Sequence, residues 1–123
     1  MGAPQVETHL PSDVKDVAEW LGVPSESIQF ETRNESIEPF AKQIKEMESS
    51  YLEFPEDNER TSAIERLLLT GEVPMPIYVQ HGDEHNFIME GRHRIVAFHR
   101  VGLTEIPVCR VRPTQTNKHR LRP

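Results

Sequence analysis

Residues 87–111 read FIMEGRHRIVAFHRVGLTEIPVCRV, and this stretch decides the fold class. Three apolar residues end abruptly at Glu90 and Gly91, as a buried β-strand does when it meets a turn. Apolar residues then recur at helical spacing until Gly102, a common helix stop. A second apolar run follows from Ile106. The stretch therefore predicts a strand, a sharp turn, a helix and a second strand.

The predicted helix begins with three basic residues, Arg92, His93 and Arg94. Helix N-termini carry unpaired amides and a partial positive charge, so they favour Asp or Glu over Arg. A bound anion would remove that conflict, and the planar arginine fork suits phosphate oxygens. Gly91 would let a phosphate approach the backbone without meeting a Cβ atom. We therefore expect an anion-binding turn over residues 91–94.

The same residues resemble the signature of the ParB/sulfiredoxin superfamily, which runs from a strand through an acidic residue, a glycine and basic residues into a helix. The matching positions run from Glu90 to Arg94 and continue through Gly102 and the strand at residues 106–108. Residues 63–79 are similar to the helix that leads into the family's proline-marked strand. The resemblance implies an α/β (α+β) fold with a small mixed β-sheet and packed helices, ParB/sulfiredoxin-like.

The resemblance also implies roles for individual residues. Members of the superfamily include nucleotide-binding partition proteins, sulfinic-acid reductases, free-serine kinases and reported nucleases, so the fold does not fix the chemistry. In relatives the last arginine of the motif commonly contacts phosphate, which implies that role for Arg94. Arg92 stands where partition proteins carry Glu and sulfiredoxins carry Cys. Because the reductase reaction needs a thiolate there, the sequence argues against that activity.

The leading prediction is nucleotide binding, with NTP or NDP phosphates at the turn from Gly91 to Arg94. Arg92 and Arg94 would contact phosphates, and His93 would donate to phosphate or ribose. Glu90 would help to hold Mg²⁺ or act as a general base, since Mg²⁺ is usually bound by one or two carboxylates plus phosphate oxygens. The structural alternatives for Glu90 are that it caps the helix or forms a salt bridge with Arg92 or Arg94. The expected cofactor is Mg²⁺ with CTP, ATP or ADP, and phosphoryl transfer with Glu90 and His93 as catalytic residues stays open.

Two other classes of function stay open. Residues 91–123 carry 8 Lys or Arg against one acidic residue, whereas residues 1–90 carry 6 against 19. A nuclease or DNA-binding accessory protein would use the basic part on phosphates, and a non-catalytic interaction or inhibitor protein would use the acidic part on a basic partner. The predicted DNA contacts are Arg110, Arg112, Lys118, Arg120 and Arg122. The residues of a metal-dependent nuclease site would be His81, His85, Glu90 and His93.

At 123 residues and 36% apolar content, the chain predicts one domain over residues 1–112 and a flexible basic tail over residues 113–123. The sequence contains no apolar run long enough for a membrane span and no signal peptide pattern, so we expect a cytoplasmic protein without a membrane partner. The lone Cys109 argues against an internal disulfide, and its apolar surroundings predict a buried thiol.

The rest of the chain predicts three further helices and two further strands. The helices are expected over residues 13–21, over 37–51, and from 58 or 61 to 70; the strands are expected at 28–30 and 77–80. Residues 54–59 read as an acidic turn, and residues 82–84 as the turn of a hairpin. Trp20 is expected in the core, with an exposed interaction role as the alternative.

Overall fold

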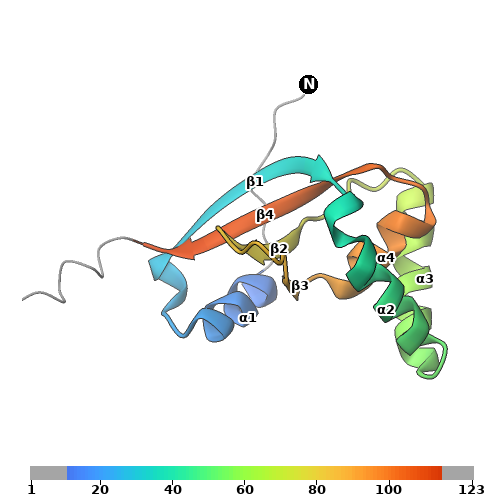
Figure 1. Ribbon diagram of the computed structural model, residues 1–123, viewed down its shortest axis with the longest axis horizontal. Coiled ribbons are helices and arrows are strands. Elements are labelled where there is room, and N and C mark those ends of the chain that lie inside the picture. Colours follow the sequence, from blue (N-terminus) through green and yellow to red (C-terminus); the bar gives the residue numbers. More distant parts are fainter. Residues whose placement is uncertain (1–10, 115–123) are drawn as a thin grey trace, which may run out of the picture.

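The computed structural model describes residues 11–114, which form four α-helices and a four-stranded sheet (Figure 1). This mixed α+β architecture confirms the predicted fold class. In chain order the elements are α1 (Pro11–Leu21), the 3₁₀ turn η1 (Ser25–Ser27), β1 (Ile28–Ser36), the 3₁₀ turn η2 (Glu38–Phe40), α2 (Ala41–Tyr51), α3 (Pro55–Leu69), β2 (Ile77–Gln80), β3 (Ile88–Glu90), α4 (Arg92–Arg100) and β4 (Glu105–Pro113).

The strands lie in the order β1-β4-β2-β3. β1 pairs antiparallel with β4 along its whole length, from Ile28 opposite Pro113 to Ser36 opposite Glu105. β2 pairs parallel with β4 and antiparallel with β3. Figure 1 shows β1 and β4 as a long two-stranded ribbon that extends beyond the short β2 and β3. The last strand of the described chain therefore lies inside the sheet and joins its two halves.

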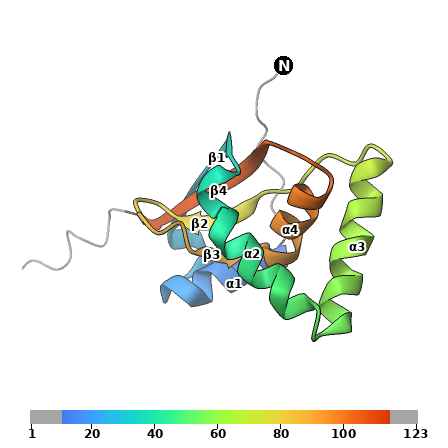
Figure 2. The same cartoon turned by 45° about the vertical axis from the view of Figure 1, so that its right-hand side comes forward.

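Helices cover both faces of the sheet. On the α2/α4 face, α2 and α4 pack on the sheet and α3 packs outside α4 (Figure 2). On the α1 face, α1 covers a smaller apolar cluster. Side chains alternate along β2, so Ile77 and Val79 join the first cluster while Tyr78 joins the second. Cys109 is buried on the α1 face, as expected, and this burial raises the pKa of its thiol.

Two expectations about the elements were wrong. α3 begins at Pro55, inside the segment that we expected to be an acidic turn. Proline is well suited to the first helical position, and Glu56 and Asp57 complement the positive end of the helix. β1 extends over nine residues instead of three. Its exposed charged residues disguise the strand in the sequence, because a strand that is buried on one side only does not need apolar residues on the other.

The sheet reaches the first residues of the predicted tail. β4 continues to Pro113, and the amide of Thr114 still donates to the carbonyl of Ser27 at 2.9 Å. Lys118, Arg120 and Arg122 lie outside the described residues. Within residues 11–114, no helix has the length and apolar character needed to cross a membrane.

Candidate functional site

β3 turns directly into α4 at Gly91, which is the N-cap of the helix and has a φ of +103°. This left-handed conformation favours glycine. A Cβ atom here would lie 3.0 Å from the Cα atom of Ile77 in β2, so packing also excludes a side chain. The glycine therefore fixes the join between β3 and α4. The side of Gly91 that would carry a Cβ atom packs against Ile77 of β2, whereas the sequence had predicted room for a phosphate there.

The first turn of α4 is formed by Arg92, His93 and Arg94. No side chain in the described part of the chain caps this turn, and the amide of Gly91 donates to its neighbour Glu90 at 3.0 Å. The first amides of a helix have no intrahelical partner, so they point outward with a partial positive charge. Arg92 is exposed and makes no ion pair with any described residue. The turn therefore offers an exposed cation beside uncapped amides.

Arg94 faces inward and connects three elements. Its Nη2 atom lies 2.9 Å from Oδ2 of Asp13 in α1, and its Nη1 atom donates to the carbonyl of Pro76 at 2.7 Å. The side chains of Arg94 and Asp13 are only 17% and 7% exposed. Breaking a pair as buried as this one leaves an uncompensated charge. The phosphate role that the resemblance implies for Arg94 would therefore compete with the carboxylate of Asp13.

His93 faces α2 and α3. Its Nε2 atom lies 2.9 Å from Oδ1 of Asp57, and its ring stacks on Tyr51 at a centroid distance of 5.4 Å. The hydroxyl of Tyr51 is the buried side-chain polar atom that has no hydrogen-bond partner in the described chain. Burial raises the pKa of this hydroxyl, and Arg92 is the charged side chain that acts on it most strongly. The partly buried His93 and the buried Tyr51 thus form a layer under the first turn of α4.

Glu90 lies on the other side of the turn, beside α1. Burial raises the pKa of its carboxyl, and a hydrogen bond with Asp16 and the charge of Asp13 act in the same direction, while the amide of Gly91 opposes them. Glu90 therefore lies beside carboxylates of α1, and a bound cation would relieve the repulsion between them.

The histidines expected in a nuclease site do not form one. His81 and His85 are exposed in the loop between β2 and β3, whereas His93 is held by Asp57 on the far side of α4. Residues 11–114 contain no group of three or more His, Cys, Asp or Glu side chains that could hold a metal ion. A Mg²⁺ ion at Glu90 would consequently need ligands from outside the protein.

Two of the predicted DNA contacts have partners within the sheet. Arg110 lies in β4, and both its Nε and Nη2 atoms donate to the carboxylate of Glu35 in β1, at 3.2 and 2.8 Å. Arg112 donates to the side-chain oxygen of Gln29 at 3.0 Å. These contacts join the two long strands. Arg110 and Arg112 therefore stabilise the pairing of β1 with β4.

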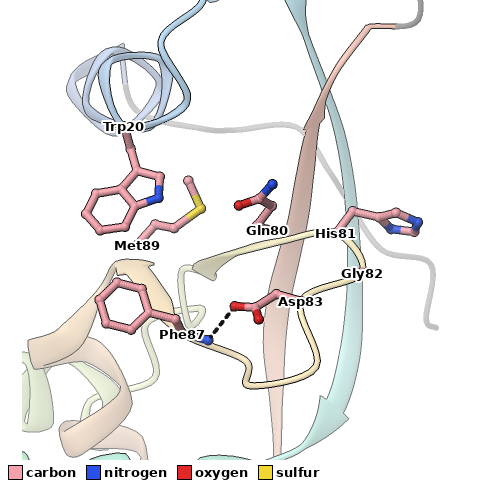
Figure 3. A pocket seen from close by; sticks show the side chains of 7 residues that line it. All are labelled: Trp20, Gln80, His81, Gly82, Asp83, Phe87 and Met89. Atoms are coloured by element: carbon pink, nitrogen blue, oxygen red, sulfur yellow. Dashed lines mark hydrogen bonds between the residues drawn. The ribbon is translucent and has the colours of Figure 1, made fainter.

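A pocket that the sequence did not predict lies beside α1, between the end of β2 and the start of β3 (Figure 3). It has a volume of about 330 Å³ and is lined by side chains that include Trp20, Phe87, Met89 and Gln80. The rings of Trp20 and Phe87 stack at 5.3 Å and are 55% and 51% exposed. The expected core position of Trp20 was wrong.

The helical spacing of α1 contains the signal that would have placed this tryptophan correctly. Asp13, Asp16 and Trp20 are three and four residues apart and share one side of the helix, whereas Val17 and Ala18 are buried against the sheet. A tryptophan that shares a helix side with two aspartates belongs to the polar edge of the helix. Its partner Phe87 is distant in the sequence, and only the fold brings the two together.

The carboxylates of Asp13, Asp16 and Glu90, the side chain of Arg94 and the pocket all lie along the line where α1 meets β3 and α4. Compared with known proteins, the chain matches no family model, no curated protein and no solved structure. The likeness to the ParB/sulfiredoxin superfamily therefore stays a prediction that rests on the motif from Glu90 to Arg94.

Proposed function

We propose that this chain is a nucleotide-binding domain whose phosphate site is the first turn of α4. The observation that carries the proposal is the uncapped helix N-terminus with the exposed, unpaired Arg92 beside it in the described chain. Helix amides and a guanidinium group are the two phosphate donors that proteins use most readily. Both are present here on a turn that Gly91 and β2 hold rigidly.

In this proposal the basic residues of the turn have different tasks. Arg92 and the backbone amides contact the phosphates. His93 has its Nε2 atom on Asp57, so a ligand would meet the opposite ring nitrogen, Nδ1. Arg94 is a positioning residue, because its contacts to Asp13 and Pro76 hold the turn from behind. The unpartnered hydroxyl of Tyr51 supports the proposal, since buried polar groups normally have partners.

A Mg²⁺ ion would enter this site with the nucleotide. Glu90 and Asp16 are the carboxylates within reach, and a divalent ion would relieve the repulsion between them. Mg²⁺ typically takes one or two protein carboxylates and completes its shell with phosphate oxygens and water. That preference fits a site with two carboxylates and without a third metal-binding side chain in the described residues.

Calorimetry with ATP, ADP, GTP and CTP, each with and without Mg²⁺, tests the proposal. We expect saturable binding of at least one nucleotide by the wild-type protein. Arg92→Gln should weaken it about tenfold, because a charge-assisted hydrogen bond contributes roughly 1.5–3 kcal/mol. Release of inorganic phosphate, measured on the same samples, shows whether binding leads to hydrolysis.

Arg33→Gln provides the matched control, because Arg33 is also exposed and its loss changes the net charge equally. It lies on β1, on another part of the molecule, so binding should stay within twofold of the wild type. Absence of heat with every nucleotide would refute the proposal. Equal losses in both variants would also refute it, because they would indicate general electrostatic attraction without a site at α4.

A further inference from the structure

We infer that the pocket beside Trp20 and Phe87 holds the base of the nucleotide and that this base is a purine. The inference rests on the proposed phosphate site at α4 and deepens it. Four observations carry it: the position of the pocket relative to the turn, the exposed aromatic pair, the polar group that faces it, and the rigid loop that holds it.

The pocket and the phosphate site lie at the two ends of one continuous strip. Along α1, Trp20 lines the pocket while Asp13 reaches Arg94, and these residues are separated by about 10 Å at 1.5 Å per residue. Along β3, Met89 lines the pocket and Glu90 directly precedes the turn. A nucleotide laid along this strip would place its base on the pocket, its phosphates on α4, and its ribose between the two.

The aromatic pair is suited to stacking. Trp20 and Phe87 lie within 23° of parallel, and about half of each side chain is exposed to solvent. Figure 3 shows their rings and Met89 on one side of the pocket, with Gln80 and Asp83 opposite and the ring of His81 turned away. Base stacking on exposed aromatic rings is a common means of nucleotide recognition. The volume of about 330 Å³ lies within the range of small-molecule sites.

Gln80 supplies a polar contact for the base. Its side chain is exposed and makes no hydrogen bond within the described chain. A primary amide offers one donor and one acceptor side by side, which can pair with the edge of any base. The choice among bases therefore rests on stacking, and a purine has the larger surface for it. The pocket favours a purine over a pyrimidine.

The loop that carries Phe87 is held in place before any ligand binds. The carboxylate of Asp83 accepts hydrogen bonds from the backbone amides of His85 and Phe87, each at 3.0 Å. These two hydrogen bonds lower the pKa of Asp83, so the carboxylate is ionised at neutral pH. A fixed loop reduces the entropy that binding would otherwise cost. The aromatic pair is thus preorganised.

Fluorescence and calorimetry together test the inference, because Trp20 is the single tryptophan of the chain. The ligands are ATP, GTP, CTP and inorganic tripolyphosphate, which has the phosphates without a base. ATP should change the emission of Trp20 at the concentration at which calorimetry detects binding, and tripolyphosphate should bind without changing it. Phe87→Ala and Gln80→Leu should each weaken ATP binding about tenfold and leave tripolyphosphate binding within twofold.

Phe54→Ala is the matched control, since Phe54 is also 51% exposed but does not line the pocket. It should bind both ligands as the wild type does, and circular dichroism should show all variants folded. ATP binding that is unaffected by both pocket variants would overturn the inference and leave the phosphate site standing. CTP binding as tight as that of ATP and GTP would overturn the choice of a purine. No binding of ATP or tripolyphosphate would instead refute the proposed function and, with it, the inference.

Discussion

The two faces of the sheet are stabilised in different ways. The α2/α4 face has twelve buried apolar residues in one cluster, and the α1 face has six. What the α1 face lacks in apolar packing it replaces with polar contacts, chiefly the buried pair of Asp13 and Arg94 and the hydrogen bond from Arg94 to the carbonyl of Pro76. The large cluster therefore determines whether the chain folds, whereas the polar contacts determine how firmly α1 is held.

This difference concerns function because α1 contacts three parts of the candidate site. Asp13 forms an ion pair with Arg94, Asp16 lies beside Glu90, and Trp20 forms one wall of the pocket. Elements with few buried apolar contacts open most easily, and ligand-binding elements are commonly drawn from that class. The less stable face is thus the one that carries the proposed ligand contacts.

Removing a large side chain from the α2/α4 face should have the largest effect. Phe98 is 1% exposed in the centre of that cluster. Phe98→Ala should lower the free energy of unfolding by about 3–5 kcal/mol, because it removes apolar contacts and leaves a cavity. Urea denaturation followed by circular dichroism measures this loss. A loss below about 1 kcal/mol would contradict the assignment of this face as the main source of stability.

Removing the buried carboxylate should affect α1 more than the rest of the molecule. Asp13→Ala leaves Arg94 buried without its partner, which costs about 3 kcal/mol. Hydrogen exchange should quicken in α1 first, and the buried thiol of Cys109 should react faster with a thiol reagent. Glu19→Ala is the control, because it removes the same charge from an exposed position of α1. Equal acceleration in both variants would contradict a specific role for the buried pair.

A smaller effect of the opposite sign is expected at Glu90. Its pKa is raised above the ordinary value of 4.5, so its stabilising contribution is present below that value and is lost as the pH rises through the raised pKa. Glu90→Gln keeps the neutral form at every pH, so its melting temperature should exceed that of the wild type at pH 7 and match it near pH 4. Thermal melts across this range provide the measurement. A lower melting temperature at pH 7 would show that the ionised carboxylate stabilises the fold.

The smallest effect is expected on the exposed side of β1. Arg33 pairs with Glu31, and both side chains are largely exposed. Surface pairs of this kind contribute little, since solvent and salt screen them. Arg33→Gln should leave the melting temperature and the urea midpoint unchanged within error. A measurable decrease in either quantity would mean that polar contacts stabilise both faces of the sheet and not the α1 face alone.

Local periodicity predicted the elements that a short stretch of sequence determines. The strand, turn and helix around Gly91 were placed correctly, and so was the following strand, because apolar spacing and two glycines mark their limits. The length of β1 was missed, since pairing with β4 stabilises it and its own residues carry charges at alternate positions. Propensity is a weak guide where such tertiary pairing decides.

The sequence likewise predicted only the part of the candidate site that a short stretch of residues determines. The basic turn follows from the sequence of residues 90–94, and the structure shows it at the start of α4. Which arginine stays exposed depends on Asp13, a residue that is distant in the sequence, and so the sequence could not separate Arg92 from Arg94. The pocket depends on the meeting of Trp20 and Phe87 and requires the three-dimensional arrangement of α1 and β3.

The charged pattern of β1 has one further consequence. β1 is an outer strand of the sheet and is nine residues long. An edge strand of this length presents backbone groups to which an identical strand could add, the first step toward aggregation. Glu31, Arg33 and Glu35 project from alternate positions of this edge, and an incoming strand would have to strip water from all of them. The residues that hide β1 in the sequence are thus the ones that protect the open side of the sheet from a second copy.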